Sequence, residues 1–293
     1  MKAKTRGIPS TKPELVFDIG LNNGDDAAYY LHLGYRVLGV EANPVLAAQC
    51  SRRFAHEIRA GRITVVNAGV LRQPGEFTFY RSLQEDGWST FAPDVHHKSS
   101  EWEELTVRCT TARELIAEHG QPVFIKVDIE GADFQVLETL TPSIAPAYIS
   151  LELNSIDPFV ERLITLGYTA FKFVDGLNFH PTPPIFNHQI GWRLLRRAGR
   201  AVPVFHGVMR RLPHPLRPKR EWNAPGRYSP DGYAFAKQSS GPFGERAGGS
   251  WLAPDAAREW LARLKSDYEK AGKLNELWWD VHARHSSAPK RRS

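Results

Sequence analysis

Short apolar runs alternate with amphipathic stretches from Leu15 to Val174. The runs are rich in Val, Ile and Phe and are about as long as buried strands, whereas the stretches between them carry apolar residues at helical spacing. This alternation predicts an α/β domain built on a mainly parallel sheet. The predicted strands are Leu15–Ile19, Arg36–Val40, Ile63–Asn67, Val123–Val127, Ala147–Leu151 and Thr169–Val174. The predicted helices are Asp25–Leu33, Val45–Arg59, Ala112–Glu118, Ala132–Leu140 and Pro158–Leu166.

Two parts of the chain add to this core. Glu76–Tyr80 and Leu105–Cys109 alternate in polarity, which predicts an inserted β-hairpin. Asp255–Lys270 and Leu274–His285 carry aromatic and apolar residues at helical spacing and are predicted helices. Their aromatic stripe favours a face that docks on the core, and it leaves a homo-oligomer open.

The first strand ends in a glycine turn, Asp18-Ile-Gly20-Leu-Asn-Asn-Gly24, and a predicted helix follows it. This layout lets the backbone approach a ligand closely, with the N–H groups of the helix pointing at that ligand. The second strand ends in Glu41, about 20 residues after the turn, where a carboxylate accepts hydrogen bonds from ribose hydroxyls. A cofactor that contains a nucleoside is therefore predicted.

The turn lacks the G-x-G-x-x-G spacing that makes room for a pyrophosphate, which disfavours a dinucleotide oxidoreductase. An acidic strand end suits a ligand with an amine and a sulfonium better than one with phosphates. The residues therefore favour S-adenosylmethionine. An ordinary strand-turn-helix with a capping Asp or Asn is the structural alternative.

A second motif, Lys126-Val-Asp128-Ile-Glu130-Gly-Ala-Asp133, joins the fourth strand to a helix. Together with VFDIGLNNGDDAAYYLHLGYRVLGVEANP, VVNAGVL and ISLELN, this motif resembles the FkbM family of S-adenosylmethionine-dependent methyltransferases. The resemblance spans about residues 14–178, with a return near 231–237. The glycine turn is generic to class I methyltransferases, whereas the second motif is far more specific. The resemblance implies the cofactor, the fold and methyl transfer, usually to oxygen, but not the acceptor.

The implied fold is a Rossmann-like class I sheet, mostly parallel, whose seventh strand runs antiparallel between the fifth and the sixth. Gly232–Lys237 is the expected seventh strand. We therefore expect a methyltransferase domain at 13–240, with an inserted basic lid at 175–231, and a C-terminal helical extension at 241–293. Because the sixth strand ends and the seventh begins at the cofactor edge, the lid is expected over that edge.

The family pattern also implies the cofactor contacts. Residues of the turn should surround the methionine part, Glu41 the ribose, and the end of the third strand the adenine. The expected cofactor residues are Asp18, Gly20, Asn22, Asn23, Gly24, Glu41, Asn67, Ala68 and Asp128.

Three carboxylates end the fourth and fifth strands and are the expected catalytic residues: Asp128, Glu130 and Glu152. Crowded carboxylates raise one another's pKa, which suits a general base for a hydroxyl acceptor. Asp128 is expected at the cofactor amino group or the acceptor, and Glu152 is the better base if the substrate comes from the lid side. Glu130 has a structural alternative, in which it orients Lys126 or caps the following helix. Oxygen ligands suit magnesium, yet we expect no metal.

Charge and composition limit the classes of partner and the location that we expect for this protein. The net charge is +6, and 192–220 holds nine Arg or Lys residues and no Asp or Glu, which favours an anionic acceptor or a solvated surface. No apolar run is long enough to span a membrane, and the two cysteines and the basic N-terminus without an apolar segment predict a cytoplasmic protein. The expected substrate contacts are Trp88, Ser89, Asn178 and His180.

The leading hypothesis is an O-methyltransferase that acts on a sugar, a glycolipid precursor or a secondary metabolite. An RNA methyltransferase is the first alternative, suggested by the positive charge, but the absence of a recognised RNA-binding motif argues against nucleic acid. A non-catalytic scaffold that binds S-adenosylmethionine is the second alternative.

Overall fold

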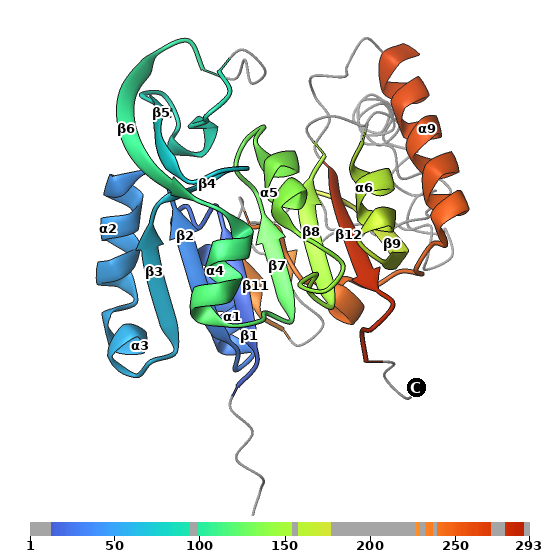
Figure 1. Ribbon diagram of the computed structural model, residues 1–293, viewed down its shortest axis with the longest axis horizontal. Helices are drawn as coiled ribbons and strands as arrows, with labels where there is room; N and C mark the ends of the chain where they lie inside the picture. Colours follow the sequence, from blue (N-terminus) through green and yellow to red (C-terminus); the bar gives the residue numbers. More distant parts are fainter. Residues whose placement is uncertain are drawn as a thin grey trace, which may run out of the picture.

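The structure, a computed structural model, describes residues 13–93, 99–153, 158–176, 227–228, 232–236, 239–270 and 279–289. Its centre is a seven-stranded sheet of order β3-β2-β1-β7-β8-β12-β9, in which β12 runs antiparallel to both neighbours and the other pairs are parallel (Figure 1). This arrangement confirms the Rossmann-like class I sheet. The strands are β1 (Leu15–Ile19), β2 (Arg36–Glu41), β3 (Ile63–Asn67), β7 (Phe124–Val127), β8 (Tyr148–Glu152), β9 (Tyr168–Asp175) and β12 (Trp279–His285).

Apolar cores cover both faces of the sheet, as parallel strands require. Phe17 and Ile19 of β1 join the core under α4 (Ala112–His119), α5 (Asp133–Thr139), α6 (Phe159–Thr165) and α9 (Pro254–Lys270). Val16 joins the other core, under α1 (Asp25–His32) and the end of α2 (Pro44–Arg53). The helix predicted at 45–59 is two helices, because the backbone leaves helical geometry at Phe54 before α3 (Ala55–Arg59).

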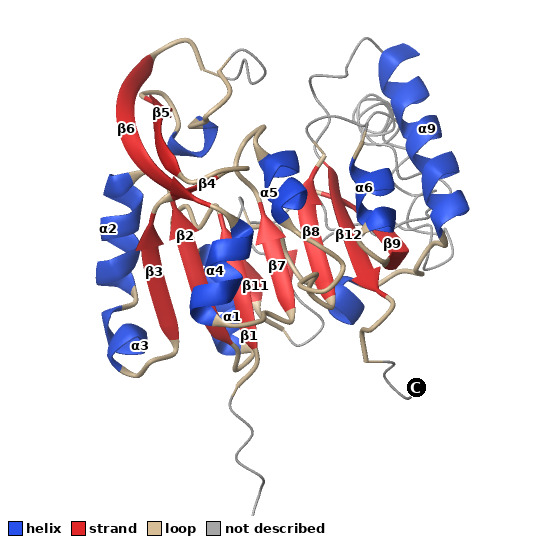
Figure 2. Cartoon of the chain, in the orientation of Figure 1, coloured by secondary structure: helices blue, strands red, loops and turns tan. Residues whose placement is uncertain are grey.

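The predicted hairpin is confirmed as β5 (Gly75–Ser82) and β6 (Trp102–Thr110), in which Phe77 pairs with Val107. With β4 (Gly69–Val70) it forms a three-stranded sheet. Figure 2 shows this sheet beyond the arrowheads of β2 and β3, at the carboxyl edge of the main sheet. The loop after β5 contains the single-turn helix η1 (Asp86–Trp88).

The seventh strand is β12, and its predicted position at Gly232–Lys237 is wrong. Within that range β11 (Ala234–Phe235) pairs instead with β10 (Arg227–Tyr228) in a separate two-stranded sheet. The ring of Phe235 packs on Tyr29 of α1, with 4.6 Å between centroids. The apolar alternation around Phe235 therefore serves a contact with a helix and not a place in the main sheet.

The helix predicted at 274–285 is also wrong over β12. Trp279, Val281 and Ala283 are every second residue of this segment, and all three are fully buried in the same core. A spacing of two residues is the periodicity of a strand. The helix predicted at 255–270 is confirmed as α9. The chain after residue 240 thus contributes both a helix and a strand of the central sheet, whereas the boundary at residue 240 itself stays a prediction.

The predicted lid falls mostly outside the described residues, and so does the basic stretch 192–220. β9 ends at Asp175, and β12 begins at its partner Trp279, so the chain between them leaves and re-enters the sheet at the carboxyl edge. Within the described part of the chain, no helix combines the length and the apolar character needed to cross a membrane.

Candidate active site

A cavity of about 360 Å³ lies at the carboxyl ends of β1, β2, β7 and β8 and is closed on one side by the hairpin loop. Ligands of open α/β sheets bind at this edge, and the volume is in the range of small-molecule sites. Part of the wall is apolar, formed by Ile19, Val40, Leu46, Ala68, Val70, Phe79, Trp88 and Phe91. Another part is acidic, formed by Glu41, Asp86, Asp128, Glu130 and Glu152.

The glycine turn is held against β2. The N–H groups of Gly20 and Leu21 both donate to the carbonyl oxygen of Val40, at 3.0 Å each. Gly20 has a φ of +85°, and a Cβ there would lie 1.8 Å from the carbonyl oxygen of Asp128. Only glycine therefore fits between the first turn and the end of β7.

Glu41 links the turn to the end of β2. Its Oε2 accepts from the N–H of Asn22 at 2.7 Å, and its Oε1 accepts from the N–H of Asn43 at 2.8 Å. Burial raises the pKa of Glu41, against the lowering effect of these two bonds. Each carboxylate oxygen keeps a second lone pair, so Glu41 can still accept from hydroxyl groups in the cavity.

A buried ion-pair group lies beneath the turn. Nζ of Lys126 is 3.4 Å from Asp18, 3.2 Å from Asp26 and 3.4 Å from Asp128. Nζ also donates to the carbonyl oxygen of Gly20 at 3.3 Å. Burial raises the pKa of Asp18 to about 7, against the lowering effect of Lys126. Asp18 is fully buried and does not line the cavity, so it supports the turn from below.

The predicted cofactor residues fall into two groups, those that line the cavity and those that hold the backbone around it. Gly20, Asn22, Glu41, Ala68 and Asp128 line the cavity.

Asn23, Gly24 and Asn67 lie outside the lining. Asn23 accepts from the N–H of Asp25 at the start of α1, and Gly24 is the residue before that helix. Asn67 donates through Nδ2 to the carbonyl oxygens of Glu41 and Ala42, at 2.8 and 3.1 Å. All three therefore shape the backbone around the cavity.

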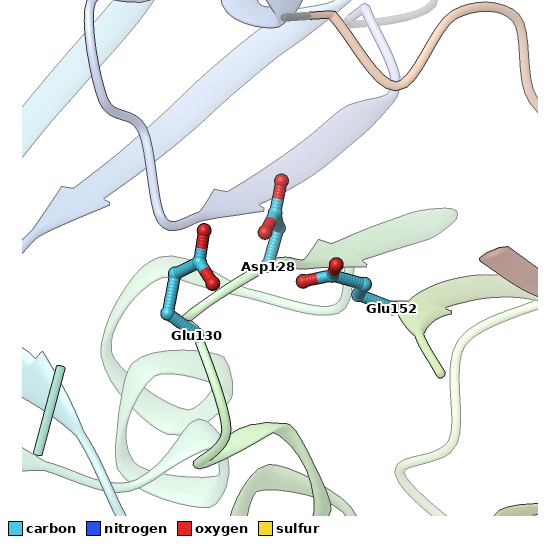
Figure 3. Close-up of side chains that lie close together, drawn as sticks. All are labelled: Asp128, Glu130 and Glu152. Atoms are coloured by element: carbon cyan, nitrogen blue, oxygen red, sulfur yellow. The ribbon is translucent and has the colours of Figure 1, made fainter. Parts of the chain in front are cut away.

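The three predicted catalytic carboxylates converge. Asp128, Glu130 and Glu152, here called the carboxylate cluster, each place one oxygen within 4.8 Å of the others (Figure 3). Asp128 and Glu130 are half-buried, and Glu152 is buried. The cluster joins the end of β7, the loop after it and the end of β8, and it can accept protons or hold a cation.

The backbone is strained at two places on the cavity wall. Among the described residues, Asn22 and Glu130 are the non-glycine residues with a left-handed φ, at 49° and 52°. Such conformations cost energy and gather at functional sites. Both residues line the cavity, so the strain turns two side chains toward the same space.

Neighbouring residues hold Glu130 in this conformation. Thr90 of the hairpin loop donates to the Glu130 carbonyl oxygen at 2.6 Å. Asp133 accepts from the N–H groups of Ile129 and Gly131, at 3.3 and 3.2 Å. The first turn of α5 is thus organised by Asp133, and the alternative role of Glu130, orienting Lys126 or capping this helix, stays a prediction.

The hairpin loop supplies residues that sequence reasoning missed. Besides Trp88 and Ser89, the cavity is lined there by Glu85, Asp86, Gly87 and Phe91. Asn43 donates to Asp86 at 3.4 Å, which ties this loop to the end of β2. The acidic Glu-Asp-Gly turn directly before Trp88 was the available signal.

Ser89 itself supports the loop: its hydroxyl donates to the Asp86 carbonyl at 2.8 Å and accepts from the N–H of Ser82 at 3.1 Å. Asn178 and His180 lie outside the described residues.

A further carboxylate lies next to the cluster, on β12. Asp280 pairs with Glu152 across the sheet and is 7% exposed. Burial, followed by the charge of Asp128, raises the pKa of Asp280 well above its usual value. Asp280 was not predicted as a site residue, because the spacing of the apolar residues around it predicts a helix.

The chemistry of the wall fits S-adenosylmethionine. The apolar part suits a purine ring, Glu41 suits ribose hydroxyls, and the acidic part suits the positive sulfonium and ammonium groups.

Comparison with curated proteins gives no match. Among solved structures, the chain is similar to a precorrin-6y C5,15-methyltransferase from Geobacter metallireducens, with 14% identity, 58% of this chain and 73% of that chain covered, and a TM-score of 0.34. It is also similar to a SAM-dependent methyltransferase from Geobacter sulfurreducens in complex with S-adenosyl-L-homocysteine, with 12% identity, coverage of 93% and 85%, and a TM-score of 0.32.

These similarities are remote, and the assignment rests on a direct family match. The methyltransferase FkbM domain matches residues 18–181, more than half of the 293 residues. The matched range contains the glycine turn, Glu41 and the carboxylate cluster. The chain therefore belongs to the FkbM family of S-adenosylmethionine-dependent methyltransferases.

Proposed function

We propose that this methyltransferase acts on oxygen, with a hydroxyl of a sugar, glycolipid precursor or secondary metabolite as the acceptor. The observation that carries the proposal is the convergence of Asp128, Glu130 and Glu152 on one cavity wall. A hydroxyl must lose its proton when it takes up a methyl group, and a carboxylate within hydrogen-bond reach can accept that proton. Neighbouring hydroxyls of a polyol can donate to the remaining carboxylate oxygens.

The described residues would divide the work. When bound, the cofactor supplies a methyl carbon attached to a good leaving group, so the protein mainly aligns the acceptor and excludes water. Glu41 holds the ribose, the turn at Gly20 holds the methionine part, and the apolar wall with Trp88 excludes water. Glu152 is the general base in this proposal, since its carboxylate belongs to the cluster on the cavity wall and is buried there.

The acceptor's charge and the protein's location stay predictions. The basic stretch 192–220, which favours an anionic acceptor, lies outside the described residues. A cytoplasmic location and a homo-oligomer also stay predictions.

The proposal is tested by transfer of a labelled methyl group to pools of glycans, lipid-linked sugars, secondary metabolites and RNA. Label is expected in a hydroxyl-bearing acceptor as an ether, which survives alkaline treatment. For that acceptor, Glu152→Gln should lower kcat by about 10²- to 10⁴-fold, the usual share of a general base. Its affinity for S-adenosylhomocysteine should stay close to that of the wild type.

Two variants control the assay. Glu41→Gln replaces an acceptor of two N–H groups and should weaken S-adenosylhomocysteine binding about tenfold or more, equal to about 1.4 kcal/mol. Glu118→Gln makes the same change on α4, where the side chain is 75% exposed, and should alter neither binding nor rate. Label found only on nitrogen or on RNA would contradict the proposal, as would an undiminished rate in Glu152→Gln.

A further inference from the structure

A second pocket, of about 340 Å³, lies next to the active cavity, between β5 and the start of α5 (Figure 1). It is here called the hairpin pocket, and its lining includes Arg72, Gln73, Phe77, Tyr80, Phe91 and Gln135. Phe91 lines both spaces, and its ring lies 4.9 Å from the ring of Phe79, which lines the active cavity. The two spaces are therefore neighbours, divided by the Phe91 ring.

Two glutamine side chains supply polar groups to the hairpin pocket. Gln135 uses only its Oε1, which accepts from the backbone N–H and the Nε of Arg72, at 3.4 and 3.3 Å. Within the described part of the chain, no group bonds to the Nε2 of Gln135 or to the amide of Gln73. Each amide N–H₂ is a donor of two hydrogen bonds. Both glutamines can therefore donate to a ligand in this pocket.

The free edge of β5 adds backbone groups to the same pocket. The N–H and C=O of Tyr80 bond to Thr90, at 2.9 Å each, so they face away from β6. In an antiparallel pair, the backbone groups of every second residue face the same edge, so the N–H and C=O of Thr78 also face away from β6. Thr78 lines the pocket, and these two groups have no partner among the residues that the structure describes. The edge of β5 thus offers one donor and one acceptor.

We propose that the hairpin pocket binds a sugar ring of the acceptor, next to the ring that is methylated in the active cavity. The inference rests on the proposed O-methylation and narrows its acceptor to a glycan of two or more rings. A sugar ring has an apolar face of C–H groups and a rim of hydroxyls that both donate and accept. The half-buried rings of Phe77, Tyr80 and Phe91 can pack on that face, and the glutamine amides and the Thr78 backbone can bond to the hydroxyls.

Charge and polarity distinguish a sugar from other occupants of the hairpin pocket. A nucleic-acid strand needs a row of cations along its phosphates. Among the described lining residues, Arg72 is the one cation, and its Nε is 3.6 Å from the carboxylate of Glu138. An acyl chain would cover the amides and the Thr78 backbone without satisfying their hydrogen bonds, which is costly. An uncharged ring with many hydroxyls fits the pocket better than either.

The test measures binding of the full-length protein, saturated with S-adenosylhomocysteine, to a printed array of oligosaccharides. Each glycan is displayed in many copies, which strengthens weak binding. We expect the wild type to bind glycans of two or more rings. Gln73→Ala and Gln135→Ala should each weaken this binding about two- to tenfold, the usual effect of one lost hydrogen bond. Tyr80→Ala should weaken it about tenfold through the loss of a packing surface.

Two controls separate loss of the pocket from loss of the fold. Gln121→Ala makes the matched change on an exposed glutamine before β7 and should bind like the wild type. Gln73 is exposed and has no hydrogen bond to any described residue, so Gln73→Ala should keep the Tm of the wild type. Absence of wild-type binding to every oligosaccharide of the array would overturn the inference. Binding that Gln73→Ala, Gln135→Ala and Tyr80→Ala all retain would overturn it as well, because the glycan would then lie elsewhere.

Failure of this inference is distinguishable from failure of the proposed function, because binding and methyl transfer are measured separately. A glycan that binds through the hairpin pocket but receives label only on nitrogen would contradict O-methylation and leave the pocket in place. Methyl transfer to a hydroxyl with the same KM in the wild type and in the three pocket variants would contradict the pocket and leave O-methylation in place. A lipid acceptor without a sugar, whose KM rises in Tyr80→Ala, would show that the pocket holds an acyl chain and would also overturn the inference.

Discussion

Burial controls the protonation of Asp133, and this gives a pH dependence of stability. Burial first, and then the charge of Asp128, raise the pKa of Asp133 from 3.8 to about 7. Between these two values the folded protein keeps a proton that the unfolded chain loses. The contribution of Asp133 to stability is therefore full below pH 3.8 and falls as pH rises to about 7, with a slope of about −1.4 kcal/mol per pH unit.

Asp133→Asn, which stays neutral, should remove that slope. The variant loses an acceptor for one of the N–H groups of Ile129 and Gly131, which adds an offset that does not change with pH. Urea unfolding in EDTA at several pH values from 4 to 7 measures the difference between the two proteins. The wild type should lose stability relative to Asp133→Asn across this range, and two parallel curves would show that Asp133 titrates normally.

Single side chains on the cavity wall were predictable only in part. The sequence places Gly20, Glu41 and Asp128 at strand ends, and the geometry of a parallel sheet then brings them to one edge. It does not tell which of two adjacent asparagines faces the ligand. That choice depends on the left-handed φ of Asn22, which turns Asn22 to the cavity and Asn23 to the start of α1.

The turns before and after α1 offer a matched pair of glycine substitutions. Gly20 and Gly34 have nearly equal φ values, +85° and +87°. A Cβ on Gly20 would meet the carbonyl oxygen of Asp128, whereas a Cβ on Gly34 would have no atom within 4 Å. Gly34→Ala should therefore cost only the left-handed strain, about 1–2 kcal/mol, with S-adenosylhomocysteine binding retained.

Gly20→Ala adds a backbone collision to the same strain and should cost more than about 4 kcal/mol. Chemical unfolding and calorimetric titration with S-adenosylhomocysteine measure both variants. If the two alanine variants were equally stable and bound the ligand equally well, the close contact between the turn and β7 would not exist in solution.

Elements of the first half of the chain were predicted well, because each strand is a short apolar run with a clear boundary. β12 was missed for two reasons. In the sequence directly before it, Leu274, Leu277 and Trp278 have helical spacing. In β12 itself, the polar residues Asp280 and His282 are buried. Asp280 and His282 point to one face and Trp279 and Val281 to the other, a pattern typical of a strand covered on both sides. Sequence periodicity alone does not show that a polar face will be buried.

At the scale of the whole molecule, the sheet is completed by the last described strand of the chain. β12 lies between β8 and β9 and pairs with both along most of its length. Trp279 is fully buried against Trp260 of α9, with 5.0 Å between centroids. Residues far apart in sequence are therefore joined in one core, and the predicted boundary at residue 240 would separate β12 from its partners.

A fragment of residues 13–240 should consequently fail to fold as a unit. It would leave β8 and β9 without their common neighbour and would remove the apolar cover that α9 gives to β9 and α6. Unpaired strand edges and exposed core surface favour aggregation. The matched control is residues 13–289, which keeps every described element and should unfold in one cooperative transition and bind S-adenosylhomocysteine like the full chain. Calorimetry measures the unfolding transition of both fragments, and titration measures their binding of S-adenosylhomocysteine. If the 13–240 fragment unfolded cooperatively and bound the ligand, the first six strands would fold without β12. Residues 241–293 would then be an extension of the domain, as the sequence predicts.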